Sequence, residues 1–187
     1  MLVGETTTFA SPLAAQHAGV STVFQEFNLL PERSVAENVY LGREPRRAGL
    51  VDRRRMHADT TALLTELGLT GLASWTRVGS LSVAQQQIVE IVKAVSYDAR
   101  IISMDEPTAA LADQEVELLY ELVHRLKERG VAILYVSHRL KEIFDLCDTI
   151  TVLKDGNHVL TTPTADIDAD RLVRTMVGRD FAGSYPD

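Results

Sequence analysis

The stretch that decides the fold is Ile101–Leu111, which has the sequence IISMDEPTAAL. Residues 100–104 form a short and mainly apolar run, RIISM. The acidic pair Asp105 and Glu106 follows it directly. A second run of the same kind, VAILYV, covers residues 131–136. Short and nearly continuous apolar runs are typical of strands that are buried on both faces of a parallel sheet. We therefore expect two such strands here.

A helix is expected between these two strands. Val116, Leu119, Val123 and Leu126 recur at helical spacing, and Gly130 is a typical left-handed cap at a helix C-terminus. Parallel strands joined by a helix bring their carboxyl ends to the same edge of the sheet, where α/β folds bind ligands. The predicted fold class is therefore α/β with a parallel sheet.

The chain before this unit is expected to add one strand and three helices. The strand covers Gly19–Phe24 and ends at Gln25. The helices begin at side chains that can cap an N-terminus: Ser34 with Glu37 in a capping box, Asp52, and Ser82 with Gln85 in a second box. The second helix ends at Leu67 before Gly68, and the third ends at about Val95. Arginines at 46–47 and 53–55 are interpreted as a solvated helix face rather than a binding patch.

The chain after residue 148 is expected to form a hairpin and a helix. Strands over 149–154 and 158–160 flank Asp155-Gly156-Asn157, and Asp-Gly is a signal for a tight turn. A helix is expected over 169–177.

Bulk properties exclude some functions. The net charge of -7 argues against a nucleic-acid partner, because phosphate binding favours a basic surface. No apolar run approaches the roughly 20 residues of a membrane-spanning helix, and the N-terminus does not resemble a secretory signal. A cytoplasmic location is therefore expected, and the single cysteine, Cys147, agrees with a reducing compartment.

Four polar residues follow the expected strands and could share one site: Gln25, Asp105, Glu106 and His138. Their chemistry suits a magnesium nucleotide, since a carboxylate can hold Mg²⁺, a second can deprotonate water, and a histidine can donate to a phosphate. Each residue alone has an ordinary structural alternative. An Asp-Glu pair often only opens a helix, and a lone histidine is more often structural than catalytic.

The sequence resembles the ATP-binding-cassette (ABC) family over nearly its whole length. IISMDEPTAAL resembles the Walker B strand and the loop after it, and LSVAQQQ (81–87) resembles the signature motif. VFQEFNLL (23–30) resembles the Q-loop, and His138 in YVSHRL resembles the switch histidine. Val83 and Ala84 replace the usual signature glycines, which is similar to the first cassette of tandem ATPases in monosaccharide importers, as is FQEFNLLPERSVAENVYLGREP (24–45).

The resemblance implies roles for particular residues. Glu106 and His138 would be catalytic, and Asp105 and Gln25 would hold Mg²⁺ beside ATP. Ser82 and Gln85 would contact the nucleotide of another cassette. The implied fold is part of a P-loop NTPase core with an inserted helical subdomain, divided into 1–29 (core with the Q-loop strand), 30–95 (helical subdomain ending in the signature helix) and 96–187 (core with the Walker B, D-loop and H-loop segments).

The sequence also departs from the family pattern. No GxxxxGK[ST] phosphate loop occurs in the 187 residues, and Ala112 replaces the acid of the D-loop. The final segment, MVGRDFAGSYPD, resembles the end of a first cassette. We therefore expect a partial cassette that begins after its Walker A loop, lacks a second cassette and binds ATP weakly by itself. Loss of a central strand would leave apolar surface and strand edges exposed.

The function implied by the resemblance is the ATP-hydrolysing subunit of a monosaccharide importer. Its partners would be a membrane permease, contacted through residues 25–43, a second cassette and, indirectly, a periplasmic sugar-binding protein. It would lie on the inner face of the membrane through the permease. The alternative is a noncatalytic module that docks on the permease, or a remnant cassette without activity.

Overall fold

The computed structural model describes residues 6–177 of the chain. The chain forms two compact units, one that ends at Val136 and one that begins at Ser137. The predicted helix over 169–177 lies inside the described part, whereas most of the closing MVGRDFAGSYPD segment lies outside it. The three functional parts expected from the sequence stay a prediction.

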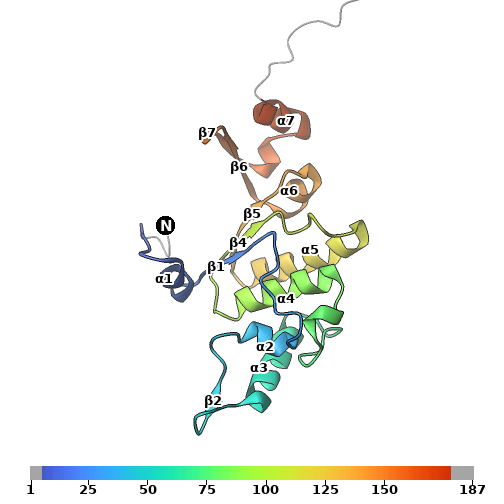
Figure 1. The fold of residues 1–187 in the computed structure, drawn as a ribbon. Helices are drawn as coiled ribbons and strands as arrows, with labels where there is room; N and C mark the ends of the chain where they lie inside the picture. The colour runs from blue at the N-terminus through green and yellow to red at the C-terminus, as the bar shows by residue number, and fades with distance from the viewer. Residues whose placement is uncertain (1–5, 178–187) are drawn as a thin grey trace, which may run out of the picture. The chain divides into compact units, whose positions relative to one another are not determined.

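A parallel three-stranded sheet forms the centre of the first unit (Figure 1). Its order is β1 (Val20–Val23), β4 (Ile101–Asp105) and β5 (Ala132–Val136). Both strand pairs are parallel, so the predicted α/β class and the parallel strand–helix–strand unit are confirmed.

Two helices cover one face of this sheet, α4 (Val83–Val95) and α5 (Asp113–Glu128). On that side Ile102 and Met104 are fully buried. The other face is open among the described residues, since Leu134 is 60% exposed. The prediction of strands buried on both faces is therefore wrong for β5, because no described element of the first unit covers its outer side. The outer side of β5 therefore exposes apolar side chains such as Leu134, and exposure of apolar surface was expected from the sequence.

The segment between β1 and α4 is mainly helical. It contains α2 (Val35–Val39) and α3 (Arg53–Glu66), which pack against each other, and α2 also packs on α4. The predicted caps are confirmed at the helix N-termini, including the reciprocal box of Ser34 with Glu37. Between the two helices lies a short hairpin of β2 (Arg46–Arg47) and β3 (Leu50–Val51). Arg46 and Arg47 therefore lie on a strand, and their assignment to a helix face is wrong.

Two arginines at the C-terminal end of α5 hold the C-terminal end of α3. Arg125 Nη1 donates to the carbonyl oxygen of Leu67 at 2.5 Å, and Arg129 forms a 2.8 Å ion pair with Glu66. Gly68 has a φ of +69°, and a Cβ at this position would overlap the guanidinium of Arg125. Glycine therefore suits the left-handed backbone here, and it leaves room for the Arg125 guanidinium to reach the Leu67 carbonyl.

The second unit has its own small core. It consists of α6 (Leu140–Leu146), β6 (Thr149–Lys154), β7 (Asn157–Pro163) and α7 (Ala169–Val177). The predicted hairpin and final helix are confirmed, although β7 is longer than expected. Its tight turn places Asp155 and Gly156 at φ values of 49° and 75°. The core is formed by Ile150, Val152, Ile167 and Leu172.

The remaining elements are short. A six-residue helix, α1 (Pro12–His17), precedes β1, and 3-10 turns cover 78–80 and 164–166. In the part of the chain from 6 to 177, none of the helices has the length and apolar character needed to cross a bilayer.

Candidate functional site

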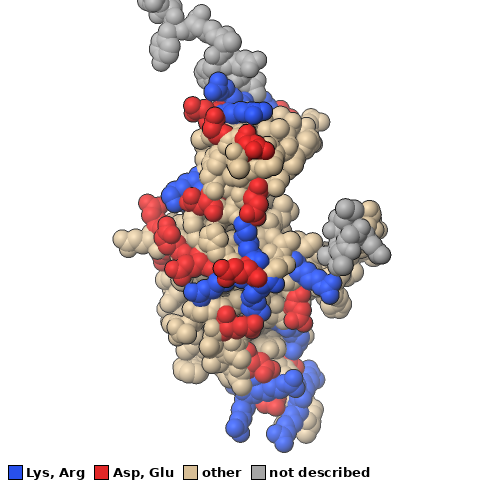
Figure 2. Space-filling view, turned by 180° about the vertical axis from the view of Figure 1, so that it is seen from behind, with Lys and Arg blue, Asp and Glu red and all other residues tan. Residues whose placement is uncertain are grey.

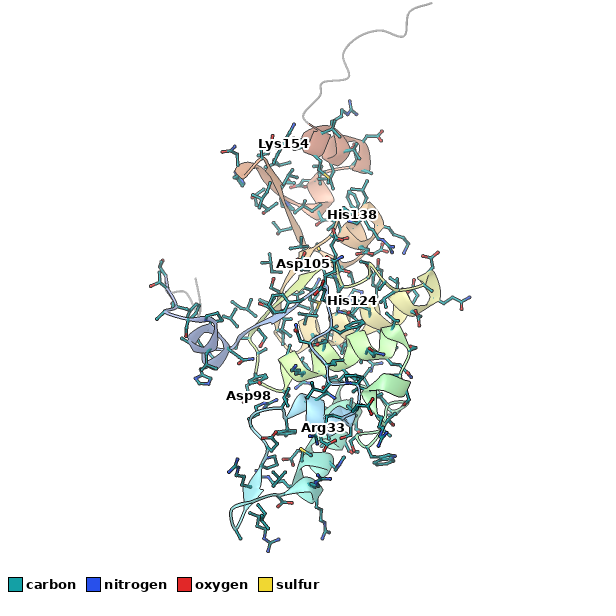
Figure 3. All side chains as sticks on the ribbon, viewed as in Figure 1. Arg33, Asp98, Asp105, His124, His138 and Lys154 are labelled. Atoms are coloured by element: carbon teal, nitrogen blue, oxygen red, sulfur yellow. The ribbon has the colours of Figure 1, made fainter. Side chains whose placement is uncertain are left out.

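Three of the candidate residues meet at the carboxyl edge of the sheet. Val23 is paired with Met104, so Gln25 and Asp105 leave adjacent strands at nearly the same level. Asp105 is the last residue of β4 (Figure 3), and Glu106 follows it directly. Gln25 and Asp105 are exposed and Glu106 is half-buried, so all three are open to a ligand.

Glu106 has an unusual backbone. Its φ is +44°, although it is not glycine. Its N–H donates to the Val136 carbonyl at 2.9 Å, and its own carbonyl accepts from Ala109 N at 3.0 Å. A left-handed non-glycine residue costs about 1 kcal/mol, and such residues cluster at functional sites. The hydrogen bonds to the neighbouring strand and to the following turn therefore hold Glu106 in a backbone conformation that is unfavourable for a residue other than glycine.

His138 is described with the second unit, two residues after the end of β5 in the chain. It is exposed. The preceding Ser137 donates to the Glu142 carboxylate at 2.9 Å and accepts from Arg139 N at 3.0 Å. These bonds fix the backbone on both sides of His138. The structure thus brings together Gln25, Asp105 and Glu106 within the first unit, and His138 belongs to the second unit.

Ser82 and Gln85 form the second predicted capping box at the start of α4. Ser82 N donates to Gln85 Oε1 at 3.1 Å, and Gln85 N donates to Ser82 Oγ at 3.3 Å. The box is confirmed as a structural feature, and Ser82 is exposed. Their contact with a nucleotide stays a prediction.

Ser82 lies outward from the sheet edge. Near the other end of α4, the Ala94 carbonyl accepts from Ser21 of β1 at 3.3 Å, and Glu90 accepts from the amide of Asn28. From Ala94 toward its N-terminus, α4 therefore runs in the same direction as β1 and extends beyond the carboxyl end of that strand. Ser82 precedes Glu90 by eight residues, or about 12 Å of helix.

The residues that hold the segment after Gln25 were not predicted from the sequence. Asn28 bonds to Glu90 through its amide and to Lys93 through its carbonyl. Asn38, which is fully buried, both donates to and accepts from the backbone of Leu30. A signal was present, because Glu90 and Asn38 are polar residues among apolar neighbours on buried helices. Their partners could not be identified from it.

A second connection fixes the far end of the same segment. The Arg43 guanidinium stacks on the rings of Tyr97 at 3.9 Å and Tyr40 at 4.9 Å from the ring centroids. It also donates to the carbonyl of Ser96 and to that of Val39, both at 2.8 Å. Residues 25–43 are therefore bound to α4 both in its middle and at its C-terminal end.

The donor set at the edge fits Mg²⁺ of the kind that binds with phosphates. Within residues 6–177 there is no group of three or more His, Cys, Asp or Glu side chains that could hold a metal. Mg²⁺ commonly takes only one or two protein oxygens and keeps water and phosphate as its other ligands. Asp105 and Gln25 supply one carboxylate and one amide oxygen, which suits that mode.

Comparison with known proteins agrees with this fold. The family model described as ABC transporter matches residues 2–109. A solved ATP-binding cassette of an ABC transporter in its ADP conformation has a TM-score of 0.69 and 24% identity, covering 89% of this chain and 67% of that one. A nucleotide-free cassette has a TM-score of 0.70 and 22% identity, with 92% and 72% covered. These likenesses concern the fold alone.

Curated relatives are more similar in sequence. A putative ribose/galactose/methyl galactoside import ATP-binding protein of Burkholderia cenocepacia is 48% identical over 98% of this chain and 35% of its own length. The ribose import ATP-binding protein RbsA of Chromobacterium violaceum is 47% identical, with 100% and 37% covered. The galactose/methyl galactoside import ATP-binding protein MglA of Salmonella typhimurium is 45% identical, with 98% and 36% covered.

The chain thus spans little more than a third of the length of these relatives. The family model nevertheless covers more than half of the chain, and it includes Gln25, Asp105 and Glu106 with the strands β1 and β4 that place them. On this match, together with the parallel sheet and its polar carboxyl edge, the chain belongs to the ABC transporter family.

Proposed function

We propose that this chain is part of the ATP-binding subunit of a monosaccharide importer, in which ATP hydrolysis drives transport. The observation that carries the proposal is the placement of Gln25, Asp105 and a strained Glu106 at one sheet edge. Relatives whose names state ribose or galactose import, 45–48% identical over nearly the entire chain, support the substrate class.

Each candidate residue would have its own role in ATP binding and hydrolysis. Asp105 and Gln25 hold Mg²⁺, which neutralises phosphate charge when it is bound. Glu106 orients the attacking water and takes its proton. His138 donates a hydrogen bond to the terminal phosphate. Ser82 and Gln85 contact a nucleotide that is held by another cassette, because α4 carries them away from their own sheet edge.

The partners follow from the same proposal. Residues 25–43 form the face toward a membrane permease, since they follow Gln25 and are anchored to α4. A second cassette and a periplasmic sugar-binding protein complete the importer. The subunit lies at the cytoplasmic face of the membrane and does not bind nucleic acid, in line with its net charge of -7.

Sugar uptake by cells of the source organism tests this proposal. Glu106→Gln is introduced at the native gene, and uptake of labelled ribose, galactose and xylose is measured. We expect uptake of at least one sugar to fall to the level of a gene deletion. Glu117→Gln, the same change at an exposed position of α5, should retain uptake. Unchanged uptake of all three sugars in the Glu106→Gln strain would refute the proposal.

A further inference from the structure

The β2–β3 hairpin is small and is closed by a tight turn. Arg46 pairs with Val51 and Arg47 with Leu50, so only Ala48 and Gly49 form the turn. Their φ values are 51° and 83°. Two consecutive left-handed residues define the tight turn whose twist matches that of paired strands. The turn therefore sets the register in which the side chains of the hairpin are presented.

The hairpin and the start of α3 form a basic surface, here defined as residues 43–55. This segment contains six of the 19 basic residues of the chain and two of its 26 acidic residues, which gives it a formal charge of +4. The rest of the chain then carries -11. Figure 2 shows basic side chains gathered where the hairpin and the start of α3 lie, with acidic side chains concentrated elsewhere.

Apart from Arg43, which is bound to the end of α4, and Arg55, which pairs with Asp59, these charges do little for the stability of the fold. Among residues 6–177, Arg47 and Arg54 form no ion pair, and Arg53 forms only a 4.0 Å contact with Glu37. Arg53 and Arg54 also lie in the first turn of α3. The helix dipole disfavours positive charge there. An anionic partner would compensate for this arrangement.

Two aliphatic side chains are exposed beside the arginines. Leu50 is 76% exposed and Val51 is 44% exposed. Exposed aliphatic residues flanked by arginine are the composition of an anchor at a membrane interface, where the apolar part enters the headgroup region and the cations meet anionic lipid. An acidic protein partner would also suit the arginines, and the experiment below distinguishes it from a lipid surface.

We propose that the basic surface of residues 43–55 binds an anionic lipid surface, with Leu50 inserted among the headgroups. This contact goes beyond the proposed transport function, because it gives the chain an affinity for lipid that needs neither nucleotide nor permease. It would add a second attachment that holds the subunit in one orientation at the membrane.

The test is sedimentation of the 187-residue chain with vesicles. Vesicles of phosphatidylglycerol mixed with phosphatidylcholine are compared with vesicles of phosphatidylcholine alone. We expect binding only to the anionic vesicles, and weaker binding as salt is raised, because screening shortens the range of the attraction. Arg46→Glu/Arg47→Glu should lower the partition coefficient at least about tenfold. Leu50→Ser should lower it about threefold and leave the salt dependence unchanged.

The matched control is Arg171→Glu/Arg174→Glu, which makes the same charge change at exposed positions of α7. It should bind within about twofold of the unaltered chain. Urea unfolding shows whether each variant remains folded. Any of three outcomes would overturn the proposal: no binding to anionic vesicles, equal binding to neutral ones, or equal losses in the hairpin and α7 variants. Binding to polyglutamate without binding to vesicles would assign the surface to an acidic protein instead.

Discussion

The backbone amide of Asn28 donates to the carboxylate of Glu90 at 2.5 Å, across 62 positions of the sequence. One turn further along α4, Lys93 Nζ donates to the carbonyl of the same Asn28 at 3.0 Å. One peptide group on each side of Asn28 is therefore held by α4. Because Gln25 lies three residues before Asn28 and Ser82 begins α4, the two segments proposed to contact nucleotide are tied to one helix.

Removal of the Glu90 carboxylate should destabilise the chain. Glu90 is only 8% exposed, so Glu90→Ala leaves the Asn28 amide without its acceptor, at a cost of about 1–3 kcal/mol in the free energy of unfolding. Glu90→Gln keeps an acceptor oxygen and should cost less than about 1 kcal/mol. Urea unfolding measures both. The control, Glu117→Ala on the exposed side of α5, should change stability by less than about 0.5 kcal/mol. Equal losses for Glu90→Ala and Glu90→Gln would show that the hydrogen bond does not contribute.

Gly68 should be more sensitive to alanine than Gly130. Both have left-handed φ values, +69° and +78°, but a Cβ at Gly130 meets nothing within 4 Å. Gly130→Ala should therefore cost only the backbone strain of about 1–2 kcal/mol. Gly68→Ala also displaces Arg125 from the Leu67 carbonyl, which should add about 1 kcal/mol.

The Arg125→Ala background separates these two costs. There the Arg125 hydrogen bond is already absent, so Gly68→Ala and Gly130→Ala should have equal effects on the free energy of unfolding. A difference that persists in this background would mean that the clamp between α3 and α5 is not its cause.

Glu37 should contribute to stability in a pH-dependent way. Its pKa is lowered, chiefly because its carboxylate accepts a hydrogen bond from the backbone N–H of Ser34. A lowered folded-state pKa gives stability that is present above the unfolded value of about 4.3 and is lost as pH falls through the folded value. Glu37→Gln should thus cost up to about 1 kcal/mol near pH 7 and almost nothing near pH 3.

Urea unfolding at the two pH values measures this difference. Glu32→Gln is the control, since Glu32 is 87% exposed and its ion pair with Arg77 spans 3.8 Å. Exposed pairs of this kind add little to stability. A cost for Glu37→Gln that does not shrink at low pH would contradict the role of the ionised carboxylate.

Local sequence signals predicted most of the fold. The helix starts at Ser34, Asp52 and Ser82 were predictable, because a cap is formed by residues within one turn of each other. The two strands on either side of α5 were predictable for a similar reason, since their apolar runs are compact and the intervening helix fixes their parallel pairing.

The features that could not be predicted from the sequence are short elements or contacts between residues that lie far apart in the chain. Helices α1 and α6 have only six and seven residues, too few for a periodic pattern. The β2–β3 hairpin turns at Ala48-Gly49, which lacks the Asn or Asp that usually marks such turns. The candidate site was predictable as a set of strand ends. The support of Gln25 through Asn28 and Glu90 was not, because it joins residues 62 positions apart.

The isolated 187-residue polypeptide should not turn over ATP. It contains no GxxxxGK[ST] segment, whose backbone amides and lysine neutralise the phosphates, so Glu106 has no anchored phosphate on which to act. Phosphate release by the purified chain measures this. A chimera in which the chain replaces the matching part of the Chromobacterium violaceum RbsA, a ribose import ATP-binding protein, is assayed in parallel. Glu106→Gln should abolish its turnover. Magnesium-ATP turnover by the isolated chain that Glu106→Gln abolishes would contradict the prediction.

Ser82 should act on a nucleotide that is held by a different cassette, and an aspartate at this position distinguishes that role from simple capping. Ser82 Oγ accepts from Gln85 N, so Ser82→Ala should cost about 1 kcal/mol of stability. Ser82→Asp caps as well as serine and should leave the free energy of unfolding almost unchanged. Asp52→Ser, the reverse exchange at the cap of α3, is the matched control for capping chemistry.

Turnover by the chimera then decides the role. If a phosphate approaches Ser82, a carboxylate there repels it, and Ser82→Asp should lose ATPase activity while its stability stays normal. Asp52→Ser should keep both. Val83 and Ala84, which stand where the family usually has glycines, restrict how closely a phosphate can approach this backbone and favour the capping alternative. Full activity of Ser82→Asp would mean that Ser82 only caps α4. Loss of activity with unchanged stability would support a phosphate near Ser82, as expected if α4, which extends about 12 Å beyond Glu90, presents Ser82 to the nucleotide of another cassette.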